Sequence, residues 1–194
     1  MLGLRTETRR EWVEIVESDL DGLLSDHAHC EVKAAHTALS LVAKYGGDYP
    51  QIVAPLSALA HEETNHFTEV YDRLTSRQAL LHTPSKDGYV NALRDAAKQM
   101  PLKVHPLLDR LLISALIEAR SAERFRLLSH HLKDESLRTF YYQLMASEAR
   151  HTRLFRGLAE SLFGTDLARE RFEQLSQHEA EIADRLPLES TVHG

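Results

Sequence analysis

The sequence predicts an all-α fold, a four-helix bundle in which a long crossover joins two helix hairpins. Apolar residues recur at helical spacing along most of the chain, and alternating runs typical of strands are few. Proline and glycine gather at a small number of places, which divide the chain into long helical segments. At 194 residues the chain can form one domain with a substantial core, and we expect a single domain over residues 1–194.

The first half of the chain predicts a short helix over residues 8–20, followed by a hairpin of two long helices. Ser25 and Asp26 resemble an N-cap for the first long helix, which should end at Tyr45 because two glycines follow it. A proline opens the second long helix, expected over residues 50–77.

The second half repeats this pattern after a proline-containing crossover with a short helix over residues 89–99. A long helix is expected over residues 107–132, and Asp134 can cap the next one, which should end before Gly164. Thr165 can cap a last helix to residue 186. Two hairpins joined by one long crossover are the ferritin-like form of the four-helix bundle, here with extra short helices at the N-terminal and C-terminal ends.

Two Glu-x-x-His tetrads, each with a glutamate 30 or 32 residues upstream, are the most informative motifs. Each of the four long helices thus has a glutamate near the middle of its apolar stripe, where a carboxylate without a partner is costly. Two divalent cations would remove both the desolvation cost and the mutual repulsion, and the i, i+3 spacing turns Glu and His to one side of a helix. The predicted metal ligands are Glu31, Glu63, His66, Glu118, Glu148 and His151.

This ligand set is rich in oxygen, with one imidazole for each metal and no thiolate. It suits iron or manganese and argues against a structural zinc site. We expect two iron ions, and manganese stays open. Two other residues have positions that relate to the site: His27 is interpreted as a surface residue rather than a group supporting Glu31, and Glu179 as partly exposed rather than a seventh ligand.

Composition limits the location and partners of the protein. The single cysteine, the missing secretory leader and the lack of a long apolar run favour a cytoplasmic protein without a membrane segment. The net charge is −6, which does not by itself invite nucleic acid. A local basic region could still grip phosphates, although ordinary ion pairs on helix surfaces explain it equally well. Its residues are Arg120, Arg124, Arg150, Arg153 and Arg156.

The segments HAHCEVKAAHTALSL, HEETNHF, LLISALIEARSAERFRLL and YYQLMASEARHTRLF resemble the tRNA hydroxylases of the MiaE family over essentially the whole chain. The resemblance implies a non-haem di-iron monooxygenase whose iron ligands are the six residues named above. It also implies hydroxylation of the isopentenyl group of 2-methylthio-isopentenyladenosine beside the anticodon, with O₂ as co-substrate and two electrons from an external protein or reductase.

Three other functions are compatible with the residues alone. A ferroxidase or iron-storage protein needs a cage, whereas we expect a monomer or dimer. A peroxide-handling enzyme of the same fold is a second alternative, and a helical binding module with incidental glutamates is a third.

Overall fold

The computed structural model describes residues 2–84 and 87–193, and the secondary structure of these residues is helical without strands. None of their helices is long and apolar enough to cross a membrane. The elements are α1 (Glu11–Ser18), α2 (Leu20–Tyr45), the 3₁₀ turn η1 (Pro50–Ile52), α3 (Val53–Ser76), α4 (Gly88–Gln99), α5 (Pro106–His131), α6 (Glu135–Phe163) and α7 (Thr165–Arg185).

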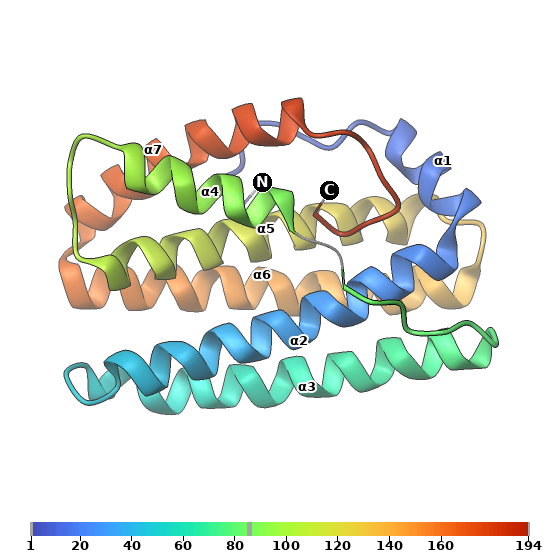
Figure 1. Ribbon diagram of the computed structural model, residues 1–194, viewed down its shortest axis with the longest axis horizontal. Helices are drawn as coiled ribbons and strands as arrows, with labels where there is room; N and C mark the ends of the chain where they lie inside the picture. The colour runs from blue at the N-terminus through green and yellow to red at the C-terminus, as the bar shows by residue number, and fades with distance from the viewer. Residues whose placement is uncertain (1, 85–86, 194) are drawn as a thin grey trace. The chain divides into compact units, whose positions relative to one another are not determined.

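The described residues form two compact units. The smaller unit comprises residues 18–84 and 190–192, and the larger unit comprises residues 2–17, 87–189 and 193. The single domain over residues 1–194 therefore stays a prediction. Each unit contains one long hairpin: α2 packs beside α3 in the smaller unit, and α5 packs beside α6 in the larger (Figure 1).

In the smaller unit, α2 begins earlier than the sequence predicts. Its N-cap is Asp19, whose carboxylate accepts a hydrogen bond of 3.0 Å from the Gly22 N–H. The predicted caps, Ser25 and Asp26, lie within the helix and accept hydrogen bonds from the backbone N–H groups of His82 and Val192, at 2.9 and 2.7 Å. They resemble caps because the same side-chain oxygens accept backbone hydrogen bonds, but their donors come from distant parts of the chain.

In the larger unit, Asp134 caps α6 as predicted, accepting a hydrogen bond of 3.0 Å from the Leu137 N–H. Thr165, by contrast, is the first residue of α7 and not its cap. The cap position is Gly164, whose φ of 89° favours glycine because it has no Cβ. Helices α4 and α7 pack against each other, and both contact α5.

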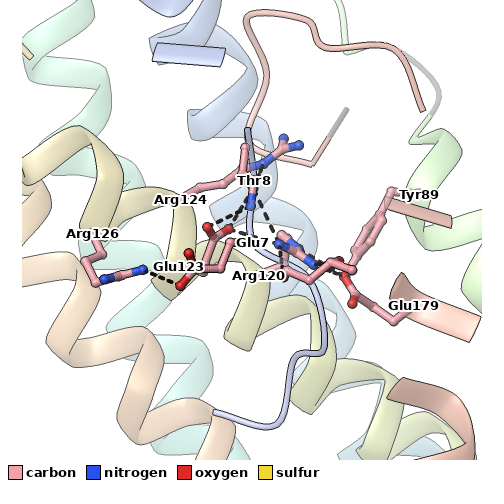
Figure 2. A network of polar contacts seen from close by, with 9 residues as sticks. Glu7, Thr8, Tyr89, Arg120, Glu123, Arg124, Arg126 and Glu179 are labelled. Atoms are coloured by element: carbon pink, nitrogen blue, oxygen red, sulfur yellow. Dashed lines mark hydrogen bonds and ion pairs between the residues drawn. The ribbon is translucent and has the colours of Figure 1, made fainter. Parts of the chain in front are cut away.

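A buried polar network fastens the N-terminal segment, α4 and α7 to α5 in the larger unit (Figure 2). Arg120 on α5 lies 2.8 Å from Glu179 on α7 and 3.0 Å from Glu123 on its own helix. The Tyr89 hydroxyl on α4 also donates to Glu179, at 2.9 Å. Thr8 donates to Glu123 through its backbone N–H at 3.0 Å and its hydroxyl at 2.7 Å. This bonding holds Thr8 outside α1, which therefore begins at Glu11 rather than at residue 8.

Burial and the neighbouring charges fix the protonation states of Tyr89 and Arg120 in this network. Burial raises the pKa of the Tyr89 hydroxyl well above its usual range, and the negative charge of Glu179 raises it further, so Tyr89 is a neutral donor. Burial alone would lower the pKa of the Arg120 guanidinium, but Glu179, Tyr89 and Glu123 raise it above its ordinary value. Arg120 is therefore a permanent cation between two buried carboxylates.

Replacing Arg120 with methionine keeps much of the side-chain volume and removes the cation, which leaves Glu179 and Glu123 buried without it. We expect Arg120→Met to lower the free energy of unfolding by about 3–5 kcal/mol, measured by urea denaturation. Arg126→Met is the matched control, because Arg126 is on the same helix but pairs with Glu7 while its side chain is 43% exposed. That control should cost less than about 1 kcal/mol. Similar losses for the two variants would contradict the assigned role of Arg120.

Candidate metal centre

The smaller unit brings three of the predicted ligands together. Glu31 lies on α2, while Glu63 and His66 lie one turn apart on α3, and all three are buried. The Nδ1 atom of His66 is 3.0 Å from Glu63 Oε2 and 3.8 Å from Glu31 Oε2. One ligand atom from each residue lies within 4.8 Å of those of the other two. We name this group the first triad.

The larger unit contains a second group of the same kind. Glu118 lies on α5, Glu148 and His151 lie one turn apart on α6, and all three are buried. The Nδ1 atom of His151 is 3.5 Å from Glu148 Oε2, and one ligand atom from each residue again lies within 4.8 Å of the others. This second triad repeats the Glu, Glu-x-x-His composition of the first.

The spacing within each triad suits a shared cation. Two ligand atoms that each lie about 2.1 Å from a metal, at a right angle, are about 3 Å apart. The nitrogen–oxygen distance of 3.0 Å in the first triad matches this value, and the distances of 3.8 Å in the first triad and 3.5 Å in the second correspond to wider ligand–metal–ligand angles. Two carboxylates and one imidazole form an oxygen-rich donor set of the kind that iron and manganese accept. Both triads therefore fit a divalent transition metal.

The structure corrects the interpretation of His27. It is fully buried on α2, and its Nε2 atom lies 2.7 Å from Glu31 Oε1, so its interpretation as a surface residue is wrong. The available signal was its position one turn before Glu31, which places both side chains on one face of the helix. His27 thus belongs to the surroundings of the first triad.

Glu179 is also buried rather than partly exposed, because Arg120 and Tyr89 hold its carboxylate. The same network changes the interpretation of two arginines expected to contact RNA. Arg120 is 1% exposed, and Arg124 is buried with its guanidinium 4.9 Å from the Trp12 ring. Neither presents a surface to a phosphate group, so the structure gives both a structural role.

The other three arginines of the basic region lie on α6, and Arg150 and Arg153 are exposed. Arg150 donates to the Ser147 hydroxyl at 2.9 Å. Arg156 is half-buried and stacks on the Phe172 ring at 4.3 Å. Their spacing of three residues places them along one side of the helix.

The helical hairpins and their Glu/Glu/His triads define an all-α, ferritin-like protein of the carboxylate–histidine class, as the sequence predicts. The chain belongs to the MiaE family, whose model, described as tRNA-(MS(2)IO(6)A)-hydroxylase (MiaE), matches residues 2–194.

Two relatives carry the name tRNA 2-(methylsulfanyl)-N(6)-isopentenyladenosine(37) hydroxylase. The protein from Pseudomonas putida is 42% identical over 151 residues, which cover 77% of this chain and 71% of the relative. The protein from Salmonella typhimurium is 30% identical over 214 residues, covering 85% and 78% of the two chains.

A solved structure is also similar to this chain. It is titled Protein 43 with aldehyde deformylating oxygenase activity, from Synechococcus, and is 37% identical with a TM-score of 0.88. The match covers 98% of this chain and 95% of the other.

Metal binding at the triads is testable through stability. Because an ion that binds only the folded chain stabilises it, anaerobic Fe(II) at about 100 times its Kd should add about 2.7 kcal/mol for each occupied triad. Glu63→Gln should remove the contribution of the first triad, whereas Glu69→Gln, a half-exposed glutamate on the same helix, should not. Thermal unfolding with and without a chelator measures the effect. Equal metal responses of Glu63→Gln and the unmodified chain would contradict the assignment of Glu63.

Proposed function

We propose that this chain is a tRNA-modifying monooxygenase that hydroxylates the isopentenyl side chain of 2-methylthio-isopentenyladenosine at position 37, beside the anticodon. The observation that carries the proposal is the presence of two buried Glu/Glu/His triads in a chain that matches the MiaE model from end to end. The two named relatives support the same substrate.

In this proposal the six triad residues would supply the ligands of two iron ions. When bound, the pair supplies the activation of O₂ with two electrons from an external reductase or electron-transfer protein. The carboxylates would balance the charge of the metals, and the histidines would supply nitrogen ligands. The proposal of two iron ions rests on the duplicated ligand pattern and on the family. The family also favours iron over manganese.

Apolar side chains around the second triad suit the substrate. Ala115 and Ala122 flank Glu118 at three and four residues on α5, Leu144 precedes Glu148 by four residues on α6, and all are buried. Such surroundings exclude water and match the hydrocarbon character of an isopentenyl group. The modified base has to leave the anticodon-loop stack for this group to reach a buried centre, and loop bases pay little for that because they are already partly unstacked.

The exposed side of α6 is proposed to hold the RNA backbone through Arg150, Arg153 and Arg156. A cytoplasmic location follows from a tRNA substrate. A monomer or dimer suits the function, since a large RNA must approach each active site.

Nucleoside analysis tests the reaction directly. Cells that lack the gene should accumulate 2-methylthio-isopentenyladenosine, and restoring the gene should convert it to a nucleoside heavier by one oxygen atom, detected by mass spectrometry. Complementation with Glu148→Gln should fail, because a ligand of the proposed centre is lost. An unchanged nucleoside profile after restoring the intact gene would contradict the proposed reaction.

The RNA surface has its own test. Arg150→Gln with Arg153→Gln should weaken binding of an anticodon stem-loop and lower the slope of log K against log salt by roughly 0.7–1 for each phosphate that is no longer neutralised. The control is Arg169→Gln with Arg185→Gln on α7, which removes the same charge from exposed positions. The same change in slope for both double variants would mean that net charge, and not the α6 residues, governs binding.

Aldehyde deformylation is a second candidate, because the similar solved structure is titled with that activity and matches nearly the whole chain. Incubation with a long-chain aldehyde, O₂ and a reductant distinguishes the candidates. Release of formate at a rate above that of RNA hydroxylation would favour this alternative.

A further inference from the structure

The two triads have the same ligand types but different residues one turn before the first glutamate. In the first triad, His27 lies four residues before Glu31, one turn earlier on α2. At the corresponding position of the second triad, four residues before Glu118 on α5, the chain has Ser114. The residue four positions before the glutamate is thus a buried histidine in one half and a buried serine in the other, so the two halves are chemically unequal.

The contact between His27 and Glu31 has a defined direction. An ionised carboxylate only accepts hydrogen bonds, so at 2.7 Å the Nε2–H group of His27 donates a hydrogen bond to Glu31 Oε1. His27 is fully buried, which makes this hydrogen bond strong and its loss costly.

The same contact assigns separate tasks to the two carboxylate oxygens of Glu31. Oε1 is held by His27, whereas Oε2 is the oxygen nearer to His66 Nδ1, at 3.8 Å. The hydrogen bond therefore fixes the rotation of the carboxylate and presents Oε2 to a cation shared with His66 and Glu63. Groups that orient a ligand in this way commonly change metal affinity by about 10–100-fold when they are removed.

We propose that His27 is a positioning residue for Glu31. It raises the affinity of the first triad for its metal ion and makes this affinity differ from that of the second triad. The inference rests on the proposed metal centre and extends it, because it predicts that two ions bind in separate steps and that only one step depends on His27.

A pair of variants of similar size isolates the hydrogen bond. Glutamine at position 27 keeps an N–H donor at nearly the reach of the imidazole Nε2, whereas methionine fills a similar volume without a donor. His36→Gln and His36→Met are the matched controls, since His36 is exposed on the same helix. Circular dichroism and thermal unfolding of the metal-free proteins establish that each variant is folded.

The measurement is an anaerobic calorimetric titration with Fe(II), which reports stoichiometry and stepwise affinity without catalysis. We expect two binding steps in the unmodified protein. His27→Met should weaken one step by about 10–100-fold and leave the other unchanged, and His27→Gln should stay within a few-fold of the unmodified protein.

The possible outcomes separate the inference from the proposed function. If the unmodified protein binds two ions and His27→Met binds both as tightly, or if His27→Gln and His27→Met lose affinity equally, the positioning role is overturned while the metal centre stands. If the unmodified protein binds no ion, the metal centre and this inference both fail. If His27→Met does not fold, an undiminished affinity in His27→Asn, whose donor is too short to reach Glu31, overturns the role, and a weakened single step supports it.

Discussion

Burying carboxylates is the constraint on which this structure depends. Each long hairpin places two glutamates inside, and a buried carboxylate without compensation costs several kcal/mol even after the surroundings relax. In each triad a histidine one turn after the second glutamate brings a nitrogen to within about 3–4 Å of the carboxylate oxygens. This arrangement is most stable when the three groups share a cation. The ligand pattern, the helix lengths and the apolar lining are therefore linked.

The chain compensates its buried acids in two different ways. Glu123 and Glu179 are held by Arg120, whose guanidinium is a permanent cation supplied by the protein. This solution is fixed, and it serves to join α5 and α7 with the N-terminal segment. The triad glutamates instead lie beside imidazoles that are suited to sharing a metal ion. In the proposed metal centre the compensating charge would come from an exchangeable ion, which can also take part in chemistry.

The comparison of Arg120 with Arg153 shows why charge along a sequence is a weak guide to RNA contacts. Both belong to the same basic region, and both lie on long helices. Arg120 faces the interior because Glu179 on α7 reaches it there, whereas Arg153 is exposed on α6. An anionic partner can use the second and not the first. The proposed RNA surface is consequently confined to one helix, and the loss of Arg120 affects stability rather than binding.

The helical class, most helix ends and the membership of both triads can be predicted from the sequence alone. These depend on local periodicity, on caps such as Asp134 and on the i, i+3 spacing of Glu63 with His66, all of which act within a few residues. Tertiary structure decided the start of α2, the burial of Glu179 and the tasks of Arg120 and His27. Each of these depends on partners or on packing from elsewhere: Ser25 bonds to His82, Arg120 bonds to Glu179, and His27 is enclosed by the surrounding structure. A polar side chain looks the same in sequence whether it meets water or a distant partner, and only the folded chain distinguishes the two.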